Sequence, residues 1–352
     1  MAREPIIQNQ SLGAADEKLN AALRPTTLAE CIGSPQLMEK LSISIAAANQ
    51  RSDSMEHVLL HGPPGLGKTT LAYVIAHELG STIKVTSGPA LTRGTDLIGI
   101  LTNLEERDVL FIDEIHRLPV AVEEYVYPAM EDYKVDFVVD SGMHSRTINL
   151  QLKPFTLIGA TTRIGLLSPP LRTRFGINHH LDFWSPDELL QRCRMSARML
   201  EVDFDEQALA TLAGRARGTP RIANRLLRRC RDYAQVKADG RLTPEAVDAA
   251  LKLEGIDELG LDELDRRFLR TVIDTYDGGP VGIEAVAATL GEETDTLVDV
   301  VEPFLLQAGL LARTRRGRCV TRRGYEHLDL APPPEPACQP DRDDNGLFDP
   351  PG

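Results

Sequence analysis

Residues Gly62-Pro63-Pro64-Gly65-Leu66-Gly67-Lys68-Thr69 are the stretch that decides the fold of this 352-residue chain. They fit the pattern G-x-x-x-x-G-K-[ST], follow an apolar run that predicts a strand, and open a helical pattern from Lys68 to Leu79. Glycine lets backbone N–H groups curl around phosphate oxygens, and the positive end of the following helix favours negative charge there. The stretch therefore predicts a P-loop, in which Lys68 reaches the β- and γ-phosphates of a nucleotide and Thr69 binds Mg²⁺.

A second motif lies downstream, where the apolar run Val109–Ile112 ends in Asp113 and Glu114. Asp113 suits the surroundings of a P-loop Mg²⁺, and Glu114 can polarise an attacking water. Two acids after a strand can also be a solvated strand end. Together with the P-loop, however, they favour a catalytic role and predict hydrolysis of a nucleoside triphosphate.

Three further positions follow the P-loop in an order that suggests function. Thr162 ends the run TLIGATT and is suited to sensing the γ-phosphate or holding the water. Arg172 and Arg174 come just after it, a position that suits an arginine finger acting on a neighbouring subunit. Arg221 opens a helix after Gly218 and can report the nucleotide state. A lone arginine is more often a surface ion-pair partner, and it is the order of these residues that favours the functional interpretation.

Short apolar runs alternate with helical patterns through the first half of the chain. This alternation predicts an α/β domain, a parallel sheet covered by helices. The expected strands are His57–His61, Ile83–Thr86, Val109–Ile112, Thr156–Ala160 and His180–Phe183. Tyr133 to Lys153 alternates differently, around Asp140-Ser141-Gly142, and predicts an inserted β-hairpin.

After Trp184 the strands stop. Helical patterns over 187–199, 205–217, 221–236 and 244–253 predict a small all-helical domain. Three more, over 262–276, 283–290 and 294–308, precede two short strands at 310–315 and 318–322, which is the arrangement of a winged helix. The expected organisation is an N-terminal extension (1–20), a large α/β domain (21–183), a helical lid (184–255), a winged helix (256–330) and a disordered Pro/Asp-rich tail (331–352).

The charge distribution changes what the composition suggests about partners. The formal net charge is −13, which taken alone argues against nucleic acid. Residues 257–311, however, carry 13 acids against 3 bases, whereas residues 312–323 carry 6 arginines and no acid. Such a patch favours contact with a phosphate backbone without base readout. The alternative is a solvated charged turn.

Other classes of protein fit the composition less well. No apolar run is long enough for a membrane helix, and the first ten residues lack the apolar segment of a signal peptide. We therefore expect a cytoplasmic protein without a membrane partner. The cysteines form no CxxC pair, which argues against a zinc site.

These motifs, in this order, resemble those of the AAA+ ATPases, and more closely those of the RuvB family of Holliday-junction branch-migration motors. The similarity covers about residues 20–328. It is carried by GPPGLGKTT, LTNLEERDVLFIDEIHRL, YPAMEDY, TLIGATTR, PLRTRFGI, GTPRIANRLLRRCRD and GGPVGIEAVA. The later motifs are more specific than the P-loop.

The resemblance implies ATP and Mg²⁺ as cofactors and roles for individual positions. Thr162 would be the first sensor, Arg221 the second sensor, and Arg174 the finger that acts in trans. Trp184 would stack on the base, where the family usually has Tyr. The other nucleotide-binding positions would be Leu23 and Arg24 on the adenine side, Gly62, Gly65, Gly67, Lys68, Thr69 and Thr70 at the phosphates, and Glu131, Asp132 and Tyr133.

The resemblance also implies macromolecular partners. Subunits would form a homohexameric ring around duplex DNA at Holliday junctions, without sequence preference. The 133–153 hairpin would dock on RuvA, and RuvC would join a larger complex. Arg313 and Arg318 would contact DNA, with Arg315 and Arg316 between them.

Two other classes of function share parts of this pattern. A clamp-loader-like or protein-remodelling AAA+ ATPase would have the same core motifs, but would give the arginine-rich segment no purpose. An ATP-gated DNA-binding regulator would use the winged helix as its main output and would bind a specific sequence.

Overall fold

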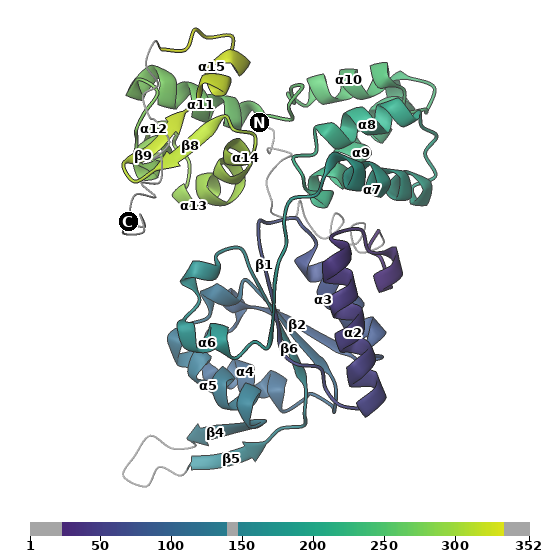
Figure 1. Ribbon diagram of the computed structural model, residues 1–352, viewed down its shortest axis with the longest axis vertical. Coiled ribbons are helices and arrows are strands. Elements are labelled where there is room, and N and C mark those ends of the chain that lie inside the picture. Colours follow the sequence, from purple (N-terminus) through teal and green to yellow (C-terminus); the bar gives the residue numbers. More distant parts are fainter. Residues whose placement is uncertain (1–22, 139–146, 334–352) are drawn as a thin grey trace, which may run out of the picture. The chain divides into compact units, whose positions relative to one another are not determined.

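The structure is a computed structural model that describes residues 23–138 and 147–333 (Figure 1). The chain divides into two compact units. Of the described residues, one unit contains 23–138, 147–200 and 218–224, and the other contains 201–217 and 225–333. The expected N-terminal extension and nearly all of the expected tail lie outside the described residues. Among the described helices none is both long and apolar enough to cross a membrane.

A parallel sheet is the centre of the first unit (Figure 1). Its strand order is β2-β3-β6-β1-β7, and every neighbouring pair runs parallel. The strands are β1 (Val58–His61), β2 (Ile83–Ser87), β3 (Val109–Asp113), β6 (Thr156–Thr161) and β7 (Ile177–His180). The predicted α/β class is confirmed.

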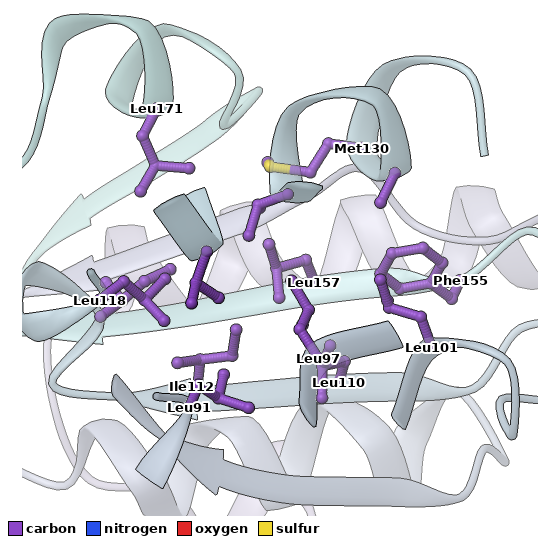
Figure 2. Packing of buried hydrophobic residues seen from close by; sticks show 14 of the residues in the cluster. Leu91, Leu97, Leu101, Leu110, Ile112, Leu118, Met130, Phe155, Leu157 and Leu171 are labelled. Carbon is purple, nitrogen blue, oxygen red and sulfur yellow. The ribbon is translucent and has the colours of Figure 1, made fainter. Parts of the chain in front are cut away.

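Both faces of the sheet are covered by apolar side chains, because successive residues of a strand point to opposite faces. On β3, Leu110 and Ile112 belong to one buried cluster, which Figure 2 shows, and Val109 and Phe111 belong to another. Helices α4 (Gly94–Leu101) and α5 (Val120–Glu131) supply the first cluster, and α2 (Pro35–Arg51) and α3 (Lys68–Glu78) supply the second. Short helical turns at Leu28–Glu30, Gly88–Ala90, Ile115–Arg117 and Ile164–Leu166, and helix α6 (Pro169–Thr173), complete the unit's connections.

The fifth strand lies earlier than the sequence analysis expected. The apolar residues of the predicted strand His180–Phe183 suggested its position, but β7 pairs Ile177 with Val58 and ends at His180. At the edge of a sheet a strand has one neighbour, so polar residues are tolerated there. Leu181 and Phe183 instead pack against the cluster on the α3 side, beyond the end of the strand.

The inserted hairpin is present as strands β4 (Lys134–Val138) and β5 (Thr147–Gln151), which pair antiparallel. The predicted turn at Asp140-Ser141-Gly142 lies outside the described residues. Helix α7 (Pro186–Met199) also belongs to the first unit, and its N-cap is Ser185, whose side chain accepts a hydrogen bond from the backbone N–H of Glu188.

The second unit contains the remaining helices of the predicted lid and the winged helix. The lid helices are α8 (Glu206–Gly214), α9 (Pro220–Lys237), whose first residues belong to the first unit, and α10 (Pro244–Leu253). The winged helix consists of α11 (Glu263–Tyr276), α12 (Ile283–Leu290), α13 (Thr294–Thr296), α14 (Glu302–Gln307), β8 (Leu311–Thr314), β9 (Gly317–Val320) and α15 (Arg322–His327).

The third helix of the winged helix was predicted as one continuous helix over 294–308, and it is interrupted. A π-helical turn, Leu297–Val301, separates α13 from α14. Pro303 stands at the start of α14. Because proline has no N–H and its ring crowds the preceding turn, the hydrogen-bond ladder widens at this point.

Candidate functional site

The P-loop joins the carboxyl end of β1 to the start of α3. Gly62 has φ of 140°, and a Cβ atom there would lie 2.3 Å from the carbonyl oxygen of Leu181. Only glycine therefore fits at this position. Gly65 and Gly67 also have positive φ, 83° and 96°. The loop therefore depends on backbone conformations that favour glycine, as the P-loop pattern predicts.

Lys68 is buried beneath this loop, with 7% of its surface exposed. Its Nζ donates hydrogen bonds to the carbonyl oxygens of Gly62 and Pro63, each at 2.8 Å. Burial lowers the pKa of Lys68 to about 8, and the nearby charge of Arg221 adds to this effect, while Asp113 and Glu114 oppose it. The site thus contains a cation whose charge is poorly solvated until an anion joins it.

Carboxylates and hydroxyls meet at the same edge of the sheet. The Thr69 hydroxyl donates to Oδ2 of Asp113 at 3.3 Å, and the backbone N–H of Glu114 donates to Oδ1 of Asp113 at 2.9 Å. Glu114 has φ of 47°, which is unusual for a residue other than glycine and is typical of functional sites. Its carboxylate forms an ion pair with Arg117 at 3.0 Å. Thr70 lies half-buried in the first turn of α3.

The end of β6 supplies a contact that the sequence analysis missed. Thr161 is 1% exposed, and its hydroxyl oxygen lies 2.9 Å from Nδ1 of His116. The same oxygen accepts a hydrogen bond from the backbone N–H of Arg163. Thr162, the predicted sensor, is half-buried directly beyond the strand. The hydroxyl pair at 161–162 was visible in the sequence, but its partner His116 was not predictable, because it comes from the turn after β3.

The start of α9 lies over the P-loop within the first unit. The backbone N–H of Arg221 donates to the carbonyl oxygen of Gly65 at 3.4 Å. The backbone N–H of Trp184 donates to the carbonyl oxygen of Gly218 at 2.9 Å, and a Cβ atom at Gly218 would lie 2.8 Å from Phe183. The structure therefore brings the predicted second sensor and the predicted base-stacking residue to the P-loop side of the sheet.

Leu23 and Arg24 lie on this side as well. Leu23 is 3% exposed, and its carbonyl oxygen accepts a hydrogen bond from the buried guanidinium of Arg192 in α7. The guanidinium of Arg24 lies 4.9 Å from the centre of the Tyr73 ring, on the P-loop helix α3. Arg192 was not predicted, since a single arginine in an amphipathic helix gives no sequence signal of its burial.

Four of the predicted nucleotide-binding residues lie elsewhere. Tyr133 contacts His57 and Phe155, with ring centres 6.4 and 5.9 Å apart, and these two residues precede β1 and β6. The P-loop follows β1, so Tyr133 lies at the opposite, amino end of the sheet. Glu131 and Asp132 directly precede Tyr133, and Arg174 contacts Glu131 through Nη2 at 3.3 Å and Nε at 3.1 Å.

The winged helix presents its arginines unequally. Arg313, Arg315 and Arg316 are exposed on the β8–β9 hairpin. Arg318 forms two 3.0 Å contacts through Nε and Nη2 with Glu302, whose side chain is 2% exposed. Arg322 pairs with Glu326 at 2.9 Å. The sequence had suggested that all six arginine charges are uncompensated, but Arg318 and Arg322 each pair with a glutamate.

Comparisons with known proteins cover nearly all of the described chain. Residues 23–181 match the family model of the Holliday junction DNA helicase RuvB P-loop domain, residues 184–257 match the RuvB AAA lid domain, and residues 258–329 match the RuvB C-terminal winged helix domain. The chain belongs to the RuvB family. The three domain types predicted from the sequence are thereby confirmed.

Individual RuvB proteins are similar over the same length. The Holliday junction branch migration complex subunit RuvB of Desulfosudis oleivorans is 58% identical over 309 residues, which is 88% of this chain and 90% of the relative. The subunit of the same name from Kosmotoga olearia is 54% identical over 316 residues, 90% of this chain and 92% of the relative. The structure of the Thermotoga maritima RuvB Holliday junction branch migration motor matches with a TM-score of 0.81 and 51% identity, over 89% of this chain and all of that one.

Membership of the RuvB family bears on what the P-loop binds. The family is one of AAA+ P-loop ATPases, so the carboxyl end of the sheet is a nucleotide-binding site. The fold also explains why the predicted residues separate into two groups. Those that follow β1, β3 and β6 meet at one edge, whereas Glu131, Asp132, Tyr133 and Arg174 lie around the other.

Proposed function

We propose that this chain is an ATP-hydrolysing subunit of a motor that drives branch migration of Holliday junctions together with RuvA. The observation that supports this best is the match of P-loop, lid and winged helix to the RuvB family, in that order, along one chain. An exposed arginine hairpin on the winged helix agrees with a polyanionic substrate.

In the proposed reaction the first group of residues binds ATP and Mg²⁺. Thr69 and Asp113 offer a hydroxyl and a carboxylate, the oxygen ligands that Mg²⁺ prefers, and their 3.3 Å contact places both at one point. Bound Mg²⁺ would neutralise charge that develops on the phosphates. Lys68 exchanges the loop carbonyls for phosphate oxygens, and Glu114 orients the attacking water. Thr162 and Arg221 respond to the γ-phosphate, while Leu23, Arg24 and Trp184 hold the base.

The second group acts on the nucleotide of the next subunit. Arg174 and the segment Glu131-Asp132-Tyr133 lie at the end of the sheet opposite their own P-loop, so they are placed to reach a different one. A ring of identical subunits, which we propose to be a hexamer, brings each such group to a neighbouring P-loop. An arginine finger supplied in this way stabilises the charge of the transition state.

The macromolecular contacts follow from the remaining elements. Arg313, Arg315 and Arg316 contact phosphates of the DNA, and Arg318 adds a contact through Nη1, since Glu302 holds its Nε and Nη2. The 133–153 hairpin docks on RuvA, and RuvC joins the complex. We keep the domain bounds 21–183, 184–255 and 256–330 and a cytoplasmic location as part of this proposal.

The test is branch migration of synthetic four-way junctions of several unrelated sequences. We expect conversion into duplex products only when ATP, Mg²⁺ and RuvA are all present, at similar rates for every sequence. ATPase that responds to a protein partner but not to DNA would instead indicate a remodelling or clamp-loader-like enzyme. Binding to a single sequence, without strand exchange, would indicate a regulator.

A further inference from the structure

Arg174 does not project freely from the surface but lies on the ring of Tyr127 in α5. Its guanidinium carbon is 4.4 Å from the ring centre, within the range of a cation–π contact. Nη1 donates to the carbonyl oxygen of Pro170 at 2.9 Å. The side chain is 23% exposed, against 54% for its ion-pair partner Glu131. The long side chain is therefore held over most of its length.

The hydroxyl of Tyr127 anchors the other edge of this ring. It donates to Oε1 of Glu123, a carboxylate in the preceding turn of α5 that is 8% exposed. The hydroxyl of Ser168 donates to the same oxygen and lies 3.2 Å from the Tyr127 hydroxyl. A buried carboxylate is stable only with such partners, so this network is a fixed part of the fold.

Ser168 connects the network to the helix that precedes the finger. It is the N-cap of α6, and its hydroxyl accepts from the backbone N–H of Leu171 at 3.2 Å. Arg174 is the C-cap residue of the same helix. Tyr127 thus touches both ends of α6, with its hydroxyl at the N-cap and its ring beneath the arginine. Glu131, four residues after Tyr127, lies on the same face of α5.

We propose that Tyr127 is a positioning residue for Arg174, and that its ring and its bond to Glu123 and Ser168 present the guanidinium to the neighbouring subunit's nucleotide. The inference rests on the proposed trans role of Arg174. Holding a flexible arginine in place beforehand removes an entropy loss that would otherwise fall on the transition state. The three residues form one cradle: Glu123, Tyr127 and Ser168.

Two substitutions separate the contributions of the ring and the hydroxyl. Tyr127→Leu removes the ring and is expected to lower kcat for ATP hydrolysis by about tenfold, with KM within about twofold. Tyr127→Phe keeps the ring but removes the hydroxyl that contacts Glu123 and Ser168. A smaller loss of kcat, about threefold, is expected. Tyr125→Phe is the matched control on the same helix, because Tyr125 packs against the same apolar cluster but takes no part in the network of Glu123, Tyr127 and Ser168.

The decisive experiment mixes two inactive variants. Subunits with Lys68→Ala keep a finger but have no working P-loop, and subunits with Arg174→Ala keep a P-loop but have no finger. Mixed rings should regain ATPase, because the first kind serves the second. We add Tyr127→Leu to one kind at a time. The added substitution should abolish most of the regained activity on the Lys68→Ala subunit and leave it unchanged on the Arg174→Ala subunit.

Three other outcomes of the mixing experiment would each contradict one part of the proposal. An equal loss in both placements means that Tyr127 only supports the fold, and no loss in either means that it does not position the finger. If the two parent variants do not complement each other, then Arg174 does not act in trans, and the proposed mechanism fails along with the cradle.

Discussion

At the carboxyl end of the central sheet, the candidate side chains come from the ends of strands β1, β3 and β6 and the segments that follow them, and Thr69 contacts Asp113 there. At the amino end, Arg174, Glu131 and Tyr133 come from helix ends and a loop, and they contact structural residues such as Tyr127, His57 and Phe155. The first group is complete within one chain. In the second, Arg174 is held by Tyr127 at the end of the sheet opposite its own P-loop, which agrees with the proposal that it serves a neighbour.

The largest difference between the two ends should appear when each loses its cation. Lys68→Ala is expected to abolish both nucleotide binding and hydrolysis, because Lys68 is the cation buried under the phosphate loop. Arg174→Ala should retain binding of a fluorescent nucleotide within about threefold and lose about 10³-fold in kcat. Arg172→Ala, an exposed residue two positions earlier, is the control and should keep full activity. Loss of binding in Arg174→Ala would contradict a role that is confined to the transition state.

A smaller effect should distinguish the two ends by pH. The ordinary pKa of lysine is about 10.4, and burial lowers that of Lys68 to about 8. Bound phosphate favours the charged form, so above this pKa binding must take up a proton. Nucleotide affinity should therefore fall by up to about tenfold per pH unit above 8.

Lys68→Arg provides the comparison for this titration, because a guanidinium keeps its charge over the same range. Its affinity, measured with the same fluorescent nucleotide, should show little dependence on pH between 8 and 10. A profile that matches the native protein would show that another group titrates.

The smallest expected effect concerns the amino end, where His57 joins three segments. Its Nδ1 accepts from the backbone N–H of Leu157 at 2.9 Å, and its Nε2 lies 3.1 Å from the carbonyl oxygen of Met130. Burial lowers its pKa, so as pH falls through its ordinary value near 6.5 the unfolded chain takes up the proton first and stability decreases.

His57→Gln should cost about 1–2 kcal/mol at pH 8 in chemical denaturation and lose less stability than the native protein between pH 7 and 5. His77→Gln, at an exposed position on α3, is the control and should leave both quantities unchanged. The ATPase activity of His57→Gln at pH 8 should remain, because the residue supports the sheet rather than the nucleotide.

The sequence predicts the carboxyl end well for a physical reason. A P-loop needs glycines at fixed spacing next to a strand, and this requirement is local, so Gly62, Lys68 and Asp113 are recognisable in order. The amino end has no such local requirement. Glu123 and Ser168 are far apart in the sequence, and nothing in their surroundings shows that one buried carboxylate accepts from both Tyr127 and Ser168.

Edges and interruptions were also beyond prediction. The hydrophobic pattern placed the last strand at His180–Phe183, whereas β7 is formed by the more polar residues Ile177–His180, which pair with β1 at the edge of the sheet. Pro303 is visible in the sequence, but a proline is also common in the first turn of an uninterrupted helix, so it did not by itself predict the π-helical turn that precedes it. Arg318 looked like one of a row of equal charges until its contact with the buried Glu302 was seen.

The pair of Arg318 and Glu302 has a consequence for the salt dependence of the proposed DNA binding. Each phosphate that a protein neutralises releases condensed counterions, which makes binding weaken as salt rises. An arginine that already holds a buried carboxylate contributes no net charge to this exchange. In the proposed DNA complex, Arg318 then adds a hydrogen bond through Nη1 but no net charge, and ions are released through Arg313, Arg315 and Arg316. The expected slope of log affinity against log salt is about −2.7 per subunit instead of about −3.6. A subunit with so shallow a slope is expected to lose comparatively little affinity for DNA as ionic strength rises.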